Sequence, residues 1–457
     1  MVDVITIETP SLGDRSYVVH DGTDALVIDP QRDIDRVLDA VADAGITVSH
    51  VAETHVHNDY VTGGLVLSRV TGARYLHADA EELSFDHEPV SDGDTFAVGT
   101  MTVEVVATPG HTAHHLSYVV RDPDGPDHAF TGGSQLLGSV GRTDLVAEER
   151  TEELTRLQHR SARRLADLLD DSTCIHPTHG FGSFCSSASS DDESDGTMAT
   201  ERSVNVALTV DDEDEFVDRL VSGLSAYPRY YVHMDPLNRS GPGPIDLSLP
   251  RAVDPPELAR RIHRGEWVID VRTRKAFAAE HLTGTVGIEL DDPFATYVGW
   301  LLPWGTPLTL VGDAHEQIQE AQRQLARIGI DRPTGAAHGE IDDWAGSGDR
   351  GRYDVVDFAG LADARRSGGA GTVLDVRRDD EWQESHLAGA AHVAIHDLLN
   401  SLDVLPEGEL WVHCASGFRA SIATSLLDRA GFDVVLIDDD FDHAEEAGLD
   451  LVVDDRA

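Results

Sequence analysis

Thr54-His-Val-His-Asn-Asp-Tyr60 places three metal-capable side chains, His55, His57 and Asp59, at alternate positions directly after the apolar run 46–52. The apolar run predicts a buried strand. A strand end holds the following loop in place, so imidazoles in that loop can converge on one ion. Metal chemistry is therefore the first hypothesis for this part of the chain.

Two later histidine clusters extend this pattern. His111 lies in Thr108-Pro-Gly-His-Thr112, and His179 ends His176-Pro-Thr-His179; both clusters follow strand-like runs. Loops at neighbouring strand ends can bring such side chains together, so we expect one metal-binding edge built from the three clusters.

The composition describes a large and very acidic chain. Its 457 residues, 40% of them hydrophobic, suffice for two or three cores, and 83 acidic against 35 basic side chains give a formal net charge of −48. Such a surface repels nucleic acids and anionic membranes, so neither is an expected partner. We interpret the spread-out acidic excess as adaptation to concentrated salt, where screening over ~3 Å at about 1 M weakens self-repulsion.

Cysteine usage and apolar content bear on location. The cysteines are few, odd in number and far apart, namely Cys174, Cys185 and Cys414, which favours a reducing compartment over a disulfide framework. The first residues lack a secretory pattern, and no stretch reaches the ~20 apolar residues of a membrane span. These features predict a halophilic cytoplasmic protein, and they leave open whether it forms a homo-oligomer.

The second half of the chain contains an internal repeat. Val268-Ile-Asp-Val-Arg272 recurs as Val373-Leu-Asp-Val-Arg377, and each copy alternates strand-like and helical runs. That alternation predicts parallel α/β sheets. We expect α/β domains at 251–348 and 352–457, after an N-terminal domain with its extension and linker at 1–245.

In the second copy a strand-like run leads into Cys414-Ala-Ser-Gly-Phe-Arg419, and a helix follows. A loop between a parallel strand and a helix N-terminus directs backbone N–H groups at one point, which favours an anion there. We expect Cys414 to be a catalytic thiolate nucleophile, with Arg419 holding an anionic substrate or steadying the loop; the alternative is a buried, inert cysteine. The expected substrate loop consists of Ala415, Ser416, Gly417 and Phe418.

The second copy contains Asp-Val-Arg, His386-Leu-Ala-Gly389 and the Cys-x-x-Gly-x-Arg loop. Together these motifs resemble the rhodanese family. The resemblance covers 352–457 and implies a sulfurtransferase in which Cys414 accepts sulfane sulfur as a persulfide and passes it to a nucleophile. The first copy reads Gly312-Asp-Ala-His315 where the cysteine would stand. We therefore expect 251–348 to be a degenerate rhodanese domain that serves as a docking or spacer module.

The N-terminal part contains three motifs, His-x-His-x-Asp at 55–59, Thr-Pro-Gly-His-Thr at 108–112 and Pro-Thr-His-Gly at 177–180. Together they resemble the metallo-β-lactamase superfamily. The resemblance implies an αββα sandwich with the metal at the sheet edges. With the two rhodanese-like domains and their parallel sheets, the expected fold class is multidomain α/β.

The longer strings 55–64, 140–145 and 180–185 are similar to persulfide dioxygenases, in particular those fused to rhodaneses. This resemblance implies a single iron(II) held by two histidines and a carboxylate. The carboxylate is expected after Thr131-Gly, where this chain has Gly133, and Tyr60 replaces a histidine that helps two-metal relatives hold a second ion. We expect Gly133→Asp to raise metal content and oxygen uptake.

Without that carboxylate, a single ion could be held by a three-histidine face made of His55, His57 and His111, with Asp59 and His179 as outer ligands. Fe(II) is the first candidate and Zn the second. The alternative is that hydrogen bonds satisfy these histidines on a disused scaffold.

Together these features predict a persulfide dioxygenase–sulfurtransferase fusion that oxidises a thiol persulfide to sulfite and transfers sulfane sulfur through Cys414. The expected small-molecule partners are a thiol persulfide, thiosulfate and sulfite. Two alternatives remain open. One is a thioester-type hydrolase that uses a metal-activated hydroxide; the other is a sulfurtransferase whose metallo-β-lactamase domain is a non-catalytic scaffold.

Overall fold

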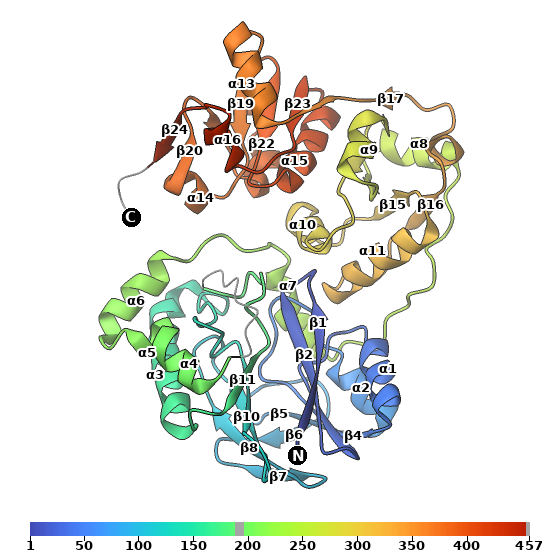
Figure 1. Cartoon of the computed structure of the whole chain (residues 1–457). Coiled ribbons are helices and arrows are strands. Elements are labelled where there is room, and N and C mark those ends of the chain that lie inside the picture. Colours follow the sequence, from blue (N-terminus) through green and yellow to red (C-terminus); the bar gives the residue numbers. More distant parts are fainter. Residues whose placement is uncertain (188–195, 454–457) are drawn as a thin grey trace. The chain divides into compact units, whose positions relative to one another are not determined.

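The computed structural model describes residues 1–187 and 196–453 (Figure 1). The chain divides into two compact units. The first unit comprises Met1–Asp246 and Gln324–Asp331, and the second comprises Leu247–Arg323 and Arg332–Ala457. Apart from Gln324–Asp331, the two rhodanese-like copies expected from the sequence lie in the second unit.

The first unit contains two mixed sheets. The six-stranded sheet has the order β1-β2-β3-β4-β5-β6, and the five-stranded sheet has the order β11-β10-β9-β8-β7. The strands of the first sheet are β1 (Asp3–Thr9), β2 (Asp14–His20), β3 (Asp24–Ile28), β4 (Thr47–Ala52), β5 (Arg74–Ala78) and β6 (Glu88–Val90). Those of the second are β7 (Thr95–Val98), β8 (Met101–Ala107), β9 (Leu116–Arg121), β10 (His128–Gly132) and β11 (Cys174–Pro177).

Alternating apolar residues pack the strands on both faces. Leu26 and Ile28 of β3 pack between the sheets with Val103 of β8 and Phe130 of β10. Because successive side chains point to opposite faces, Val27 joins an outer cluster instead. Helices α1 (Asp35–Ala44) and α2 (Gly64–Thr71) cover that outer face, and α3 (Thr151–Leu168) covers the outer face of the other sheet. The predicted αββα sandwich is confirmed.

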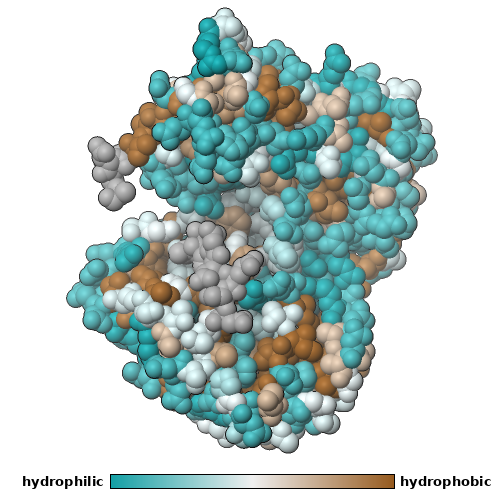
Figure 2. All heavy atoms as spheres, in the orientation of Figure 1, coloured by the Kyte–Doolittle hydropathy of each residue, from teal (hydrophilic) through white to brown (hydrophobic). Residues whose placement is uncertain are grey.

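The remaining helical elements of the first unit follow β10 or β11 in the chain. They are η1 (Glu148–Arg150), α4 (Met198–Val204), α5 (Val206–Thr209), α6 (Glu213–Ser222) and α7 (Tyr231–Ser240). Figure 2 shows that the visible face of the molecule is mostly hydrophilic, as the acidic composition implies. Across the described residues, no helix is long and apolar enough to cross a membrane.

The second unit contains two parallel sheets, with the orders β14-β12-β15-β16 and β18-β23-β22-β19-β21, and two small antiparallel pairs, β13-β17 and β20-β24. The first copy contains α8 (Pro255–His263), β12 (Trp267–Asp270), α9 (Arg274–Ala279), β13 (His281–Leu282), β14 (Val286–Gly287), α10 (Phe294–Leu301), β15 (Leu308–Gly312), α11 (His315–Arg327), β16 (Gly335–His338), α12 (Ile341–Ala345) and β17 (Arg350–Gly351). The second contains β18 (Asp354–Val356), α13 (Phe358–Ser367), β19 (Thr372–Asp375), α14 (Asp379–Glu384), β20 (Ser385–Leu387), β21 (Ala391–His392), η2 (Ile395–Asn400), η3 (Leu402–Val404), β22 (Leu410–His413), α15 (Phe418–Arg429), β23 (Val434–Ile437), α16 (His443–Glu446) and β24 (Leu451–Val453).

The repeated Asp-Val-Arg motif makes the same contacts in both copies. Arg272 lies 2.7 Å from Asp270 and Arg377 lies 2.7 Å from Asp375, and each aspartate is fully buried at the end of its strand. A buried charge is tolerated when it is paired and hydrogen-bonded. The motif therefore braces each α/β copy.

Candidate metal centre and cysteine site

Loops at the ends of four strands carry the residues that the sequence predicts for the metal site. The residues after β4 are His55, His57 and Asp59; His111 follows β8, Gly133 follows β10 and His179 follows β11. Every one of these positions is buried. Strand ends from both sheets thus supply the candidate centre.

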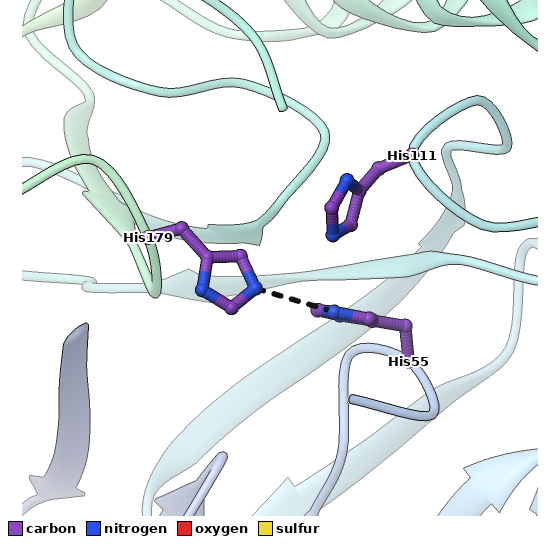
Figure 3. A group of neighbouring side chains, drawn as sticks. All are labelled: His55, His111 and His179. Carbon is purple, nitrogen blue, oxygen red and sulfur yellow. Dashed lines mark hydrogen bonds between the residues drawn. The ribbon is translucent and has the colours of Figure 1, made fainter. Parts of the chain in front are cut away.

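His55, His111 and His179 form the histidine cluster of this centre (Figure 3). Their ligand nitrogens all lie within 4.8 Å of one another, and Nε2 of His55 is 3.3 Å from Nε2 of His179. Among the described residues, Nε2 of His111 has no hydrogen-bond partner although it is buried. Leaving a buried polar atom unsatisfied costs about 1–3 kcal/mol. An ion inside the cluster would give this nitrogen a partner.

The other ring nitrogens are held by hydrogen bonds. The Thr54 hydroxyl donates to Asp29 at 2.7 Å, so it accepts from Nδ1 of His55, which is 2.9 Å away. Nδ1 of His111 donates to the carbonyl of Arg142 at 2.7 Å. Each ring therefore carries its lone pair on Nε2. Burial and the neighbouring His179 lower the pKa of His111 to about 3, so this ring is neutral at neutral pH, as metal binding requires.

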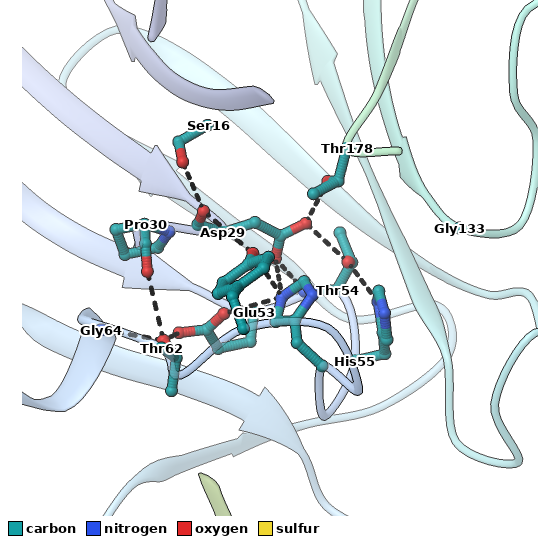
Figure 4. Close-up of polar contacts among 12 residues, drawn as sticks. Ser16, Asp29, Pro30, Glu53, Thr54, His55, Thr62, Gly64, Gly133 and Thr178 are labelled. Carbon is teal, nitrogen blue, oxygen red and sulfur yellow. Dashed lines mark hydrogen bonds and ion pairs between the residues drawn. The ribbon is translucent and has the colours of Figure 1, made fainter. Parts of the chain in front are cut away.

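His57 turns toward a different set of partners. Its Nε2 lies 3.2 Å from Glu53, 3.3 Å from Asp29 and 3.0 Å from the hydroxyl of Tyr60. Burial favours the neutral ring, but Asp29 and Glu53 outweigh it and raise the pKa of His57 to about 9. Figure 4 shows Asp29 and Glu53 among the polar groups beside His55. The structure therefore departs from the predicted three-histidine face, because His179 accompanies His55 and His111 in place of His57.

The packing around Gly133 explains the missing carboxylate. A Cβ atom added at Gly133 would lie 2.2 Å from Cδ2 of His111, so the imidazole fills the space that a side chain would need. The Gly133 N–H also donates to Nε2 of His115 at 3.0 Å. Gly133 thus holds the His115 ring through its backbone N–H, and its lack of a side chain leaves room for the His111 ring.

A buried asparagine and a cavity border the centre. Asn238 of α7 donates to the carbonyls of His57 and Tyr60 and accepts from the Thr62 N–H, each at 2.9 Å. These bonds fix the loop that carries the metal motif. A cavity of about 660 Å³ lies beside it, with a lining that includes Val56, Asn58, Thr112, His114, Tyr231 and Arg239. The space is adequate for a small-molecule substrate.

The Cys414 loop joins β22 to α15 in the second unit. Cys414 is buried, and its Sγ accepts a hydrogen bond from the Ala420 N–H at 3.3 Å. Gly417 has a φ of 87°, and a Cβ there would lie 2.1 Å from Asp438 Oδ1. Only glycine fits both the left-handed backbone and this close approach. The predicted strand-loop-helix setting of the thiol is present.

Arg419 is held by a carboxylate that the sequence analysis did not single out. Its guanidinium donates to both oxygens of Glu381 on α14, at 2.5 and 2.6 Å. Burial alone would raise the pKa of Glu381, but Arg419 lowers it to about 2. Of the two roles expected for Arg419, this geometry favours steadying the loop. No spacing rule linked position 381 to 419 in advance.

The cysteine-less copy contributes to the surroundings of Cys414. The Tyr297 ring of α10 lies 5.7 Å from the Phe418 ring, and the Trp300 ring stacks on His396 at 5.0 Å. Burial, opposed by nearby Arg419, raises the pKa of Tyr297 to about 12. The first copy therefore contacts the second copy beside the Cys414 loop.

Comparisons with known proteins agree with this architecture. The family model described as a rhodanese-like domain matches residues 359–446. The crystal structure of a metallo-β-lactamase from Staphylococcus aureus is similar over 74% of this chain and 99% of that chain, with a TM-score of 0.64 and 25% sequence identity. The chain combines a metallo-β-lactamase fold with a C-terminal rhodanese-like domain. The fold class predicted from the sequence is confirmed.

Curated relatives of the metallo-β-lactamase-fold part include persulfide dioxygenases. The mitochondrial persulfide dioxygenase ETHE1 of Bos taurus is 28% identical over 241 residues, which cover 52% of this chain and 80% of that protein. The lactamase-like protein notP of an Aspergillus species is 30% identical over 177 residues, which cover 37% of this chain and 49% of that protein. The predicted relationship to persulfide dioxygenases is confirmed, and the histidine groups together with these relatives support a metal-binding enzyme.

Proposed function

We propose that the chain is a two-site enzyme of persulfide metabolism. The metallo-β-lactamase-fold part would oxidise a low-molecular-weight thiol persulfide, and the rhodanese-like domain would move sulfane sulfur through Cys414. The observation that carries the proposal is the presence, in one chain, of a buried histidine cluster beside a cavity and a cysteine at a strand-to-helix loop. The persulfide dioxygenase relatives support the oxidative half.

The proposed oxidation is RSSH + O₂ + H₂O → RSH + SO₃²⁻ + 2H⁺. Four electrons pass from the outer sulfur to dioxygen, and the S–S bond breaks. His55 and His111 would hold the ion, which for this oxidation would be Fe(II); Zn, the second candidate, has no redox chemistry and would fit the hydrolase alternative instead. When bound, a single redox-active ion supplies open coordination positions for persulfide and dioxygen. The Asn238-braced loop would keep the rings aligned, and the neighbouring cavity would admit the thiol.

The proposed transfer has two steps. The thiolate of Cys414 attacks the outer sulfur of RSSH, the S–S bond breaks, and RSH leaves with the proton. Sulfite then attacks the outer sulfur of the Cys414 persulfide and leaves as thiosulfate, which frees the thiolate. The loop backbone and the Ala420 N–H would hold the sulfur, while Glu381 and Arg419 would keep the loop in shape. The reducing conditions that such a thiol needs agree with the proposed cytoplasmic location.

Oxygen uptake and sulfur transfer test the two halves separately. The protein is purified without oxygen in concentrated salt, loaded with Fe(II), and mixed with glutathione persulfide. We expect persulfide-dependent oxygen uptake with sulfite formed, and thiosulfate-to-cyanide sulfur transfer that is lost in Cys414→Ser. Sulfur transfer without oxygen uptake by the iron-loaded protein would support the scaffold alternative. Thioester hydrolysis by a zinc-loaded protein that takes up no oxygen would support the hydrolase.

A further inference from the structure

Gly133 removes a negatively charged ligand from the metal centre, and the structure does not leave its space open. The His111 ring fills the volume into which a side chain at 133 would extend. A carboxylate side chain at position 133 therefore cannot reach the ion. Any third protein ligand must come from another element.

His179 occupies the appropriate place. Its Nε2 is 3.3 Å from Nε2 of His55, and both belong to the group that includes His111. Two nitrogens bound to one ion at about 2.0–2.1 Å in a tetrahedral arrangement lie about 3.4 Å apart. The observed separation therefore suits a shared ion. The three rings come from loops after three different strands, β4, β8 and β11, so they approach the centre from separate directions.

Two buried carboxylates stand behind His179. Its Nδ1 lies 2.9 Å from Asp14 Oδ1 and 3.1 Å from Asp59 Oδ2, and all three side chains are buried. A carboxylate that accepts the second N–H of a metal-bound imidazole fixes the ring and makes it a stronger donor. Position 133 supplies no carboxylate, but the carboxylates of Asp14 and Asp59 place negative charge on the far side of the His179 ring from the centre.

The other histidines near the centre are less well placed to join His55 and His111. Nε2 of His57 contacts Glu53 and Asp29, and although its buried Nδ1 has no hydrogen-bond partner among the described residues, His57 groups with Asp59 and His179 and not with His55 and His111. Nε2 of His115 accepts the Gly133 N–H. His114 is exposed. His179 is accordingly the ring best placed to join His55 and His111.

We propose that His179, backed by Asp14 and Asp59, replaces the missing carboxylate as the third protein ligand of a single divalent transition-metal ion on His55 and His111. The relation to dioxygenases, on which the proposed function rests, suggests which ion is bound. The ligand set itself is independent of the reaction that the ion supports.

Metal binding by the full-length apoprotein tests this ligand set without any assay of catalysis. The protein is titrated with Co(II) under nitrogen, bound metal is counted by mass spectrometry, and the visible Co(II) bands are recorded. We expect one equivalent, and X-ray absorption at the cobalt edge should fit three imidazoles from the protein. Binding of no cobalt, or of a second equivalent at comparable affinity, would overturn the proposal.

Variants identify the ligands. His179→Ala and His111→Ala should each abolish stoichiometric binding, whereas His57→Gln should retain one equivalent. His114→Ala is the matched control, because this ring is three residues from His111 and exposed. Loss of cobalt in His57→Gln with retention in His179→Ala would exclude our ligand set. Circular dichroism and thermal unfolding confirm that each variant is folded. If His179→Ala does not fold, His57→Gln decides the question, because retention of one equivalent excludes the rival set of His55, His57 and His111 and its loss contradicts our set.

The carboxylates are tested by amide variants. Asp14→Asn and Asp59→Asn should each weaken Co(II) binding by ~10–100-fold, the range found for outer partners of metal ligands. Unchanged affinity in both would remove the carboxylates from the proposal. An iron-loaded wild-type protein that takes up no oxygen with persulfide contradicts the proposed function but not this ligand set, so the two failures are distinguishable.

Discussion

Single ring orientations decide the chemistry of the N-terminal centre. His55 and His57 are two residues apart, yet Nε2 of His55 faces His179 while Nε2 of His57 faces two carboxylates. Alternate residues of a strand would point to the same face, but the segment after β4 is a loop with bends, so each ring turns toward its own buried partners. Nε2 of His55 is available to an ion shared with His111 and His179, whereas Nε2 of His57 balances the buried charges of Asp29 and Glu53.

Gly133→Asp is predicted to lose metal and not to gain it, in contrast to the expectation from sequence. The new Cβ would lie 2.2 Å from the His111 ring, so the ring must move away from His55 and His179. Overpacking of this kind costs about 1–3 kcal/mol. Co(II) titration and calorimetric unfolding of the variant provide the measurements. Gly243→Ala is the control, because a Cβ there meets nothing within 4 Å; higher metal content in Gly133→Asp would contradict the prediction.

At the scale of elements, the Cys414 loop depends on a contact between two helices. Glu381 of α14 holds Arg419 of α15 through two hydrogen bonds. The fold brings these helices together through the parallel sheet, in which β19 pairs with β22. The loop geometry is therefore a property of the packed second copy and not of the loop sequence alone.

Glu381→Gln is predicted to destabilise the second unit by about 1.5–3 kcal/mol, the range for a hydrogen bond to a charged group. Sulfur transfer by Cys414 should fall as well, because the guanidinium loses its fixed partner. All six tryptophans of the chain lie in the second unit, so the urea dependence of tryptophan fluorescence follows that unit alone. Glu384→Gln, at an exposed position on the same helix, should change neither quantity.

The effect of Glu381→Gln should depend on pH. Arg419 lowers the pKa of Glu381 to about 2 in the folded state, against about 4.3 for an unperturbed glutamate. A carboxyl with a lowered pKa stabilises the fold above its unfolded pKa, and that contribution is lost as the pH falls through the folded pKa. The stability difference between wild type and Glu381→Gln should thus be full at pH 7 and smaller at pH 3. An equal difference at both would disprove the linkage.

On the scale of the whole molecule, charge is the dominant property. A net charge of −48 is spread along the chain, and basic side chains are too few to neutralise it. Many of the arginines still form ion pairs, such as Arg156 with Glu213 and Arg164 with Asp92. Exposed pairs of this kind contribute little individually. We therefore expect dissolved salt to reduce the self-repulsion of the folded surface.

Salt is predicted to raise the thermal unfolding temperature. The screening length falls from ~10 Å at 0.1 M to ~3 Å at about 1 M, which weakens repulsion between surface carboxylates. Thermal unfolding in potassium chloride at these two concentrations gives the test, with sucrose as an uncharged control for preferential exclusion. A midpoint that stays constant between the two salt concentrations would disprove the predicted adaptation.

The parts of the molecule that follow local rules could be predicted from sequence. Alternating apolar residues determined the strands, the repeated Asp-Val-Arg motif revealed two related α/β copies, and the motifs at strand ends located both sites. Partners distant in sequence could not be predicted this way. Glu381 meets Arg419, and Asp14 meets His179, only because separate strands and helices pack together.

The sequence by itself determined which residue types follow which strands, because hydrophobic periodicity and loop chemistry are local properties. It also determined that position 133 has no ligating side chain and that Cys414 is the only cysteine of the repeat. Only the tertiary structure decided that His179 stands with His55 and His111 and that His57 does not. The reason is physical: a ring nitrogen turns toward whichever buried partners the packed sheets bring within hydrogen-bond distance, and those partners lie far away along the chain.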